Sequence, residues 1–121
     1  MVGELNVQIF YQNNNLKTRC EDPNKAKKKY GNETANNLFK TLNYIKSANS
    51  LNDIINFPSL HFHELKGDKK GIYSIDLMKR KSKWRLYIKL VDKNNNPIIY
   101  NTGNETNISF LRICEVKDHG K

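Results

Sequence analysis

Residues 61–92 read HFHELKGDKKGIYSIDLMKRKSKWRLYIKLVD, and this stretch decides the fold. It contains two runs in which apolar and polar residues alternate, with a short basic segment between them. Such alternation is typical of antiparallel strands that each bury one face. The stretch also carries nine Lys and Arg but four Asp and Glu. It therefore predicts a cationic antiparallel surface, and the partner that such a surface favours is a polyanion, RNA above all.

The two runs assign side chains to faces. The first run places three apolar residues on one side, Tyr73, Ile75 and Leu77. The second run separates an apolar face from a polar one, with Trp84, Leu86, Ile88 and Leu90 against Arg85, Tyr87 and Lys89. The polar face alternates cation, aromatic ring and cation. That alternation is the strongest indication of RNA contact, because RNA-binding sheets combine cations with aromatic rings.

The first half of the chain is mostly helical. Alternation over residues 5–11 predicts an initial strand. Asp22 and Pro23 are then the N-cap and the first residue of a basic helix, and Gly31 ends that helix. A second helix begins near residues 32–34. Its apolar residues recur at helical spacing as one buried stripe, Ala35, Leu38, Phe39, Leu42, Ile45 and Ala48.

Shorter elements complete the expected architecture. They are helical turns at 16–20 and 51–55, an edge strand at 61–65, a basic turn at 79–83, a polar insertion at 94–107 with a short strand at 97–100, and a last strand at 108–116. A strand, then helices, then an antiparallel meander make an α+β domain. A chain of 121 residues fits a single domain over 1–121 with one core.

The net charge of +9 is concentrated in two segments. Residues 17–30 contain six basic and two acidic residues, so this segment and residues 61–92 together account for the whole excess. No segment approaches the ~20 apolar residues that span a bilayer, and the N-terminus has no charged-then-apolar signal. Cys20 and Cys114 suit no metal motif and are expected to be buried free thiols. A cytoplasmic protein is predicted.

The sequence lacks the motifs of most enzyme classes. It has no Gly-rich phosphate loop or nucleophile elbow, and His61-x-His63 has no third metal ligand nearby, so no metal or other cofactor is expected. RNA cleavage needs less, because the 2′-hydroxyl of the substrate is itself the nucleophile. The protein must take the proton of that hydroxyl, stabilise the charge on the phosphate and protonate the departing 5′-oxygen.

A histidine, an arginine, lysines and a tyrosine can share these tasks. The residues predicted to do so are His119, Arg85, Lys66, Lys83 and Tyr87. The cations predicted to bind RNA are Lys69, Lys70, Lys79, Arg80, Lys81, Lys89 and Lys117. For His119 the alternative is an unstructured tail residue, because it stands two positions from the chain end. For any single Lys the alternative is a solvated side chain.

Five groups of residues form a specific combination. They are Tyr30-Gly31, Ser50-Leu51-Asn52-Asp53-Ile54, residues 65–75 (LKGDKKGIYSI), Trp84-Arg85-Leu86-Tyr87-Ile88 and Val116-Lys117-Asp118-His119. Together they resemble the RelE/ParE superfamily of bacterial toxins, and most of all its HigB branch. The most specific part is Leu-x-Gly, then Gly-x-Tyr-Ser-Ile, then Trp-Arg in the next strand. The branch often ends Asp-Tyr-His, whereas Asp118 and His119 are adjacent here.

The resemblance implies a helical hairpin packed against a twisted antiparallel sheet. It also implies an endoribonuclease that cuts mRNA in the ribosomal decoding site without a metal ion. By position, Arg85 resembles the arginine that stabilises the phosphate, Lys66 a cationic active-site residue and His119 the C-terminal catalytic residue. His61 or His63 corresponds to a second histidine of the family.

The resemblance also implies partners. HigB-like toxins pair with helix-turn-helix antitoxins, so a HigA-like antitoxin, the ribosome and mRNA are expected, and specific DNA binding would belong to the antitoxin. Residues 25–29 are a second candidate surface, for ribosomal RNA, for the antitoxin or for solvent alone. Two other functions stay open: a gyrase inhibitor without nuclease activity, as in the ParE branch, and a non-catalytic RNA-binding accessory protein. His119 favours the nuclease, because ParE-like chains generally lack a terminal histidine.

Overall fold

A five-stranded sheet organises the structure, a computed structural model that describes residues 6–69, 71–77, 83–99 and 108–118. The strand order is β1-β5-β4-β3-β2, with β1 at Gln8–Tyr11, β2 at His63–Glu64, β3 at Tyr73–Asp76, β4 at Trp84–Val91 and β5 at Phe110–Asp118. Neighbouring strands from β2 to β5 pair antiparallel, whereas β1 pairs with β5 in parallel. The predicted edge position of the strand at β2 is confirmed.

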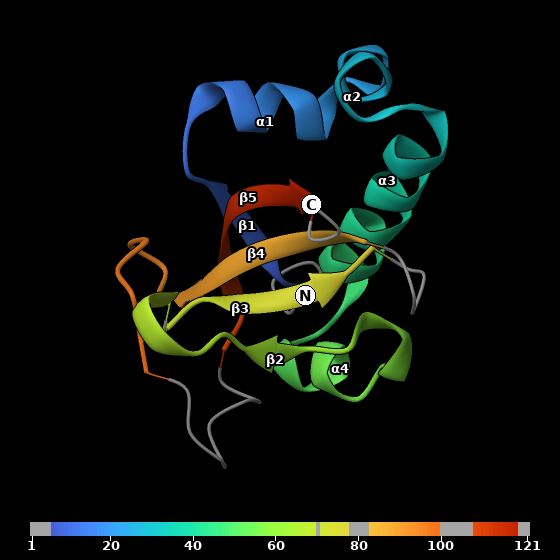
Figure 1. The fold of residues 1–121 in the computed structure, drawn as a ribbon. Helices are drawn as coiled ribbons and strands as arrows, with labels where there is room; N and C mark the ends of the chain where they lie inside the picture. The colour runs from blue at the N-terminus through green and yellow to red at the C-terminus, as the bar shows by residue number, and fades with distance from the viewer. Residues whose placement is uncertain (1–5, 70, 78–82, 100–107, 119–121) are drawn as a thin grey trace.

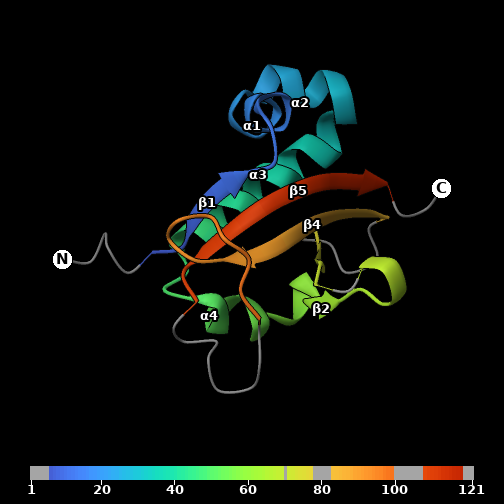
Figure 2. The same ribbon diagram turned by 90° about the vertical axis from the view of Figure 1, so that its left-hand side faces the viewer.

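Four helices follow β1 in the described part of the chain. They are α1 (Asn14–Glu21), α2 (Pro23–Tyr30), α3 (Asn32–Ser47) and α4 (Leu51–Ile55), and two 3-10 turns, η2 (Pro58–Leu60) and η3 (Gly67–Lys69), flank β2. Figures 1 and 2 show α1 and α2 on the β1–β5 side of the sheet and α3 running from them along the strands. The predicted α+β class, with helices packed against a sheet, is confirmed. None of these described helices is both long and apolar enough to cross a membrane.

Local sequence sets where α2 begins and ends. The Asp22 carboxylate accepts the backbone N–H of Asn24 at 3.0 Å, and Pro23 occupies the first turn. Gly31 has a φ of +90° and donates its N–H to the Lys27 carbonyl at 2.8 Å. This backbone conformation favours glycine, so the chain leaves the helix there. The predicted start and end of the helix are both confirmed.

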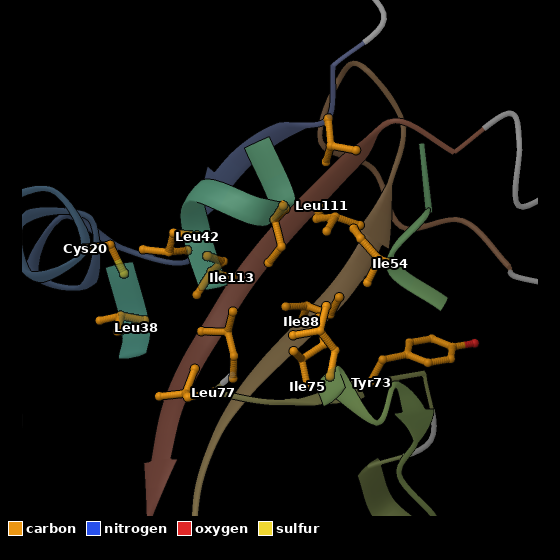
Figure 3. Packing of buried hydrophobic residues seen from close by; sticks show 14 of the residues in the cluster. Cys20, Leu38, Leu42, Ile54, Tyr73, Ile75, Leu77, Ile88, Leu111 and Ile113 are labelled. Atoms are coloured by element: carbon orange, nitrogen blue, oxygen red, sulfur yellow. The ribbon is translucent and has the colours of Figure 1, made fainter. Parts of the chain in front are cut away.

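The core lies between α3 and one face of the sheet (Figure 3). The side chains with at most 1% exposure include Leu38, Leu42 and Ile45 from α3, and Ile75, Leu77, Leu86, Ile88, Leu90, Leu111 and Ile113 from or next to the strands. They belong to the apolar stripe that the sequence predicts for α3 and to every second residue of the strands. Burial of this apolar surface supplies the main stabilisation of the fold.

The sheet differs from the expected one in two ways. It is mixed rather than wholly antiparallel, because β1 and β5 are far apart in the sequence and no hairpin fixes their relative direction. The register of β4 against β5 also shifts between Tyr87, which pairs with Glu115, and Ile88, which pairs with Ile113. The extra residue, Cys114, is a β-bulge that changes the alternation of β5. As a result Val116 packs against the core.

The shorter elements are partly as predicted. The turn at 16–20 is the longer helix α1, and the turn at 51–55 is α4. Of the short strand expected at 97–100, the structure has an isolated bridge between Val91 and Pro97 and a hydrogen bond from the Ile98 N–H to the Leu90 carbonyl at 2.9 Å. Most of the predicted basic turn, residues 79–82, lies outside the described residues.

Replacing Leu38 by Ala tests whether α3 and the sheet share one core. Leu38 is fully buried, so truncation leaves a cavity, and we expect the free energy of unfolding in urea to fall by about 3 kcal/mol. Ile99 is 84% exposed. Ile99→Ala is therefore the matched control and should change the same quantity by less than about 0.5 kcal/mol. Equal losses in the two variants would contradict the assignment of the core.

Candidate functional site

One end of the sheet gathers polar side chains from four neighbouring segments. At this end β3 and β5 finish and β4 begins (Figure 1). The strand register aligns Asp76 with Arg85, and Arg85 with Lys117. Extending the β2–β3 register by two residues brings His61 opposite Asp76. We call these four residues, His61, Asp76, Arg85 and Lys117, the polar row.

An ion pair between Asp76 and Arg85 forms the centre of the polar row. Asp76 is fully buried, and its Oδ1 lies 3.0 Å from Arg85 Nε. Arg85 Nη1 also donates to the Trp84 carbonyl oxygen at 3.4 Å. A buried carboxylate is strongly unfavourable without a cationic partner, so the pair stabilises both side chains. The Arg85 side chain is 19% exposed and still reaches solvent.

His61 lies against the other oxygen of the same carboxylate. It ends η2 in the left-handed backbone conformation (φ +47°), and its Nδ1 is 3.8 Å from Asp76 Oδ2. The His63 ring packs against the His61 ring with 4.5 Å between centroids, and His63 Nδ1 lies 2.8 Å from the His61 carbonyl oxygen. Of the two candidate histidines, His61 is therefore the one beside the ion pair.

Tyr87 occupies the next row along the sheet. It pairs with Ser74 on β3 and with Glu115 on β5, and it is buried but lies outside the main apolar core. The predicted separation of Arg85 and Tyr87 from the apolar face of β4 is thus confirmed. The Tyr87 side chain, however, is buried rather than exposed to solvent.

Lys66 lies towards the opposite end of the sheet. The hydrogen bond from the Leu65 N–H to the Ile72 carbonyl continues the β2–β3 register, which brings Lys66 opposite Gly71. Gly71 precedes Asp76 by five residues, on the order of 16 Å along an extended strand. The structure therefore does not bring Lys66 into the polar row.

The other predicted cations are distributed over both ends of the sheet. Lys89 pairs with Arg112, whose guanidinium binds Asn95 through Nε (3.0 Å to Oδ1) and Nη2 (2.7 Å to the carbonyl oxygen). Lys83 is exposed just before β4, and Lys69 is exposed in η3. His119, Lys70, Lys79, Arg80 and Lys81 lie outside the described residues.

Asp76 is the residue that the sequence interpretation missed. A signal for it exists, because Asp76 stands between Ile75 and Leu77 in an otherwise apolar run. An acidic side chain is almost never fully buried unless it is paired. The opposing strand contains one arginine in register, Arg85. The pattern therefore indicates a buried ion pair once the register is known.

A second basic surface is formed by residues of α1 and α2. These helices lie near the β1–β5 edge of the sheet, away from β2 (Figure 1). A cleft of about 460 Å³ is lined by two neutral polar and four cationic residues, Asn15, Thr18, Arg19, Lys25, Lys28 and Lys29. We call it the α1–α2 cleft. Its lining contains no carboxylate and no apolar residue. Lys27 is exposed on the same helix but does not line the cleft.

The two cysteines do not supply a reactive thiolate. Both are free; Cys20 is buried, as predicted, whereas Cys114 is only half-buried. Burial raises the pKa of Cys20 to about 12 and also raises the pKa of Cys114 above its ordinary value. Both thiols are therefore protonated at neutral pH. The chemistry that the polar row favours is charge stabilisation and proton transfer.

A family model described as "RelE-like toxin of type II toxin-antitoxin system HigB" matches residues 9–102. The matched range includes three of the four residues of the polar row and all residues that line the α1–α2 cleft. No curated protein and no solved structure matches the chain.

The raised pKa of Cys20 predicts that its thiol reacts slowly at neutral pH. It also predicts that the free energy of unfolding falls in alkaline solution. At neutral pH the native thiol should hold roughly a thousandfold less thiolate than an unfolded one, and a chromogenic disulfide reagent should report correspondingly slow reaction. Above pH 9 the unfolded thiol loses its proton first, so the free energy of unfolding should fall as the pH rises towards about 12. Cys20→Ala should lose part of this dependence. Fast reaction of Cys20 in the native protein at neutral pH would contradict the assignment.

Proposed function

The chain belongs to the HigB-like family, the RelE-like toxins of type II toxin–antitoxin systems, and we propose that it is an endoribonuclease that cuts mRNA on the ribosome without a metal ion. The observation that carries this proposal is the ion pair of Asp76 and Arg85 at an end of the sheet that also holds His61 and Lys117. It supports a site in which a fixed positive charge meets a phosphate.

In the proposed reaction the RNA 2′-oxygen forms a bond to phosphorus while the bond from phosphorus to the 5′-oxygen breaks. The products are a 2′,3′-cyclic phosphate and a free 5′-hydroxyl, so no cofactor is consumed. Negative charge builds on the phosphate oxygens in the transition state, and Arg85 is proposed to stabilise it. Because Asp76 already holds the guanidinium, little rearrangement is required when the RNA binds.

Proton transfer requires two more groups. His119 is proposed as the base that takes the proton from the 2′-hydroxyl. The strand that leads to it ends at Asp118, which pairs with Trp84 next to Arg85. His119 itself lies outside the described residues, so its role rests on the family resemblance. The second group protonates the 5′-oxygen as it leaves, and His61 is the imidazole beside the ion pair.

The remaining candidates are proposed to hold the RNA rather than to react. Lys83 and Lys117 are exposed at the end of the sheet where the polar row lies. Lys66 is exposed at the other end and suits a neighbouring phosphate of the same strand. Tyr87 is buried in the next row, where it supports the face that carries Arg85.

The α1–α2 cleft is proposed to bind phosphates of ribosomal RNA. Peptide recognition by a helix or a strand generally places apolar side chains in pockets, and the lining of this cleft has no apolar residue. Phosphates are bound by lysine, arginine and polar side chains alone. The composition of the cleft therefore favours RNA over an antitoxin segment.

Membership in a type II family implies an antitoxin partner. We propose a HigA-like helix-turn-helix antitoxin that neutralises this toxin in the cytoplasm and carries the specific DNA binding of the complex. The alternatives are a ParE-like inhibitor of gyrase and a non-catalytic accessory protein. Stalled supercoiling with mRNA of unchanged length would favour the first, and tight RNA binding without toxicity would favour the second.

Substitution of Arg85 tests the proposed reaction. Primer extension on translating ribosomes should reveal codon-phased cuts with the wild-type protein, and Arg85→Ala should reduce the rate by about 10²–10³-fold, because the charge on the phosphate loses its fixed partner. Lys40 is exposed on α3 and belongs neither to the polar row nor to the α1–α2 cleft, so Lys40→Ala is the control and should cut normally. Undiminished cutting by a double Arg85→Ala, His119→Ala variant would reject the proposed site.

Salt dependence tests the proposed role of the α1–α2 cleft. Ribosome binding by the inactive Arg85→Ala protein should weaken as salt rises, and Lys28→Gln should lower the slope of log K against log salt by roughly 1 for a lost phosphate contact. Lys27→Gln removes the same charge from the same helix but not from the cleft, and it should leave most of the slope intact. Identical slopes for the two variants would show that only net charge matters.

A further inference from the structure

We propose that Asp76 is a positioning residue that fixes the orientations of Arg85 and His61 together; its effect on RNA cleavage rests on the proposed function. The buried carboxylate presents one oxygen to each partner, with Oδ1 at 3.0 Å from Arg85 Nε and Oδ2 at 3.8 Å from His61 Nδ1. Asp76 is fully buried and therefore does not touch the substrate. It acts through the two side chains that reach solvent.

For Arg85, the two observed contacts fix the plane of the guanidinium. Nε lies 3.0 Å from Asp76 Oδ1 in the ion pair, and Nη1 donates to the Trp84 carbonyl oxygen at 3.4 Å. The guanidinium is planar and carries five N–H donors in a rigid arrangement, so two held nitrogens determine the directions of the whole group. A phosphate that approaches the end of the sheet then meets an ordered donor rather than a flexible side chain.

For His61, the carboxylate selects which nitrogen faces the substrate. The backbone of His61 is tied to η2, because its N–H donates to the Pro58 carbonyl at 3.0 Å. Its Nδ1 faces Asp76, so Nε2 points away from the carboxylate, and 48% of the side chain is exposed. As the proposed acid, His61 carries a proton on both ring nitrogens: the one on Nδ1 lies on the side of the carboxylate, and the one on Nε2 is the proton that the 5′-oxygen takes.

Asp76 also supplies the negative charge of the polar row. Arg85 adjoins it from β4 with Lys117 beyond on β5, and His61 and His63 adjoin it from the β2 side. Without the carboxylate, the neighbouring cations of β4 and β5 would repel each other, and solvent would draw the arginine outwards. One buried residue thus orders a site whose other members are all cations or imidazoles.

The first test measures the orientation of Arg85 without reference to activity. In the folded wild-type protein, NMR should show Arg85 Nε–H exchanging with solvent at least about tenfold more slowly than in the urea-unfolded chain, because Nε lies 3.0 Å from a buried carboxylate and most of the Arg85 side chain is covered. Asp76→Asn keeps the shape and removes the charge, so this protection should be lost. Asp53→Asn is the control, because the Asp53 carboxylate accepts the Asn49 N–H at 2.9 Å at the start of α4. It should leave Arg85 protected.

The second test separates positioning from general stability. On translating ribosomes, Asp76→Asn should lower kcat at least about tenfold with little change in KM, because binding by the outer lysines persists while the oriented groups are lost. Asp53→Asn should change neither constant at a temperature where both variants are folded.

Three results would overturn the proposal. They are rapid Nε–H exchange in the wild type, retained protection in Asp76→Asn, and a loss of kcat that is equal in Asp76→Asn and Asp53→Asn. The exchange rate in the wild type decides the matter even where Asp76→Asn does not fold. If the wild-type protein does not cut RNA, the proposed function fails, and the exchange rates still decide whether Asp76 orients Arg85.

Discussion

Strand β4 has to satisfy two environments at once, and the rest of the structure depends on this constraint. Its residues fall into two sets, with Leu86, Ile88 and Leu90 in the core and Arg85, Tyr87 and Lys89 on the opposite face. A slip of one residue would exchange the two faces, so both neighbouring strands must match the alternation. β3 does so without interruption. β5 does so through the bulge at Cys114, after which Val116 packs against the core and Lys117 joins the polar row.

The Asp76–Arg85 ion pair is an inefficient way to stabilise this sheet. Removing both charges from water costs several kcal/mol, and apolar residues of similar volume often stabilise a fold as well or better. The position of the ion pair indicates a role other than stabilising the sheet. Asp76 is the last residue of β3 and Arg85 the second of β4, so the pair lies where the sheet opens to solvent. The positive charge of Arg85 offsets the free-energy cost of burying the Asp76 carboxylate. The same ion pair orders the Arg85 side chain, which still reaches solvent.

Most of the fold could be predicted because its signals are local: helix caps, the stripe of α3 and the alternation of β3 and β4. The direction of β1 could not, because it depends on pairing between the two ends of the chain. In the site, Arg85 and its face followed from alternation. The choice of His61 over His63 did not, because residues two apart share a strand face and only the register against Asp76 separates them. Lys66 illustrates the same limit, since it is close to His61 in sequence but β2 leads away from the polar row.

The two basic surfaces differ in one respect that divides their proposed tasks. The α1–α2 cleft gathers four cations without a carboxylate in its lining, so their mutual repulsion is relieved by any bound phosphate, whether or not a bond is breaking. Such binding is the same for ground state and transition state and cannot by itself accelerate a reaction. In the polar row, Asp76 holds Arg85 in one orientation. A fixed cation discriminates between a phosphate at rest and one that is gaining charge. We therefore propose that the excess positive charge of the chain divides into a part that attracts RNA and a smaller part, ordered by one buried carboxylate, that can act on it.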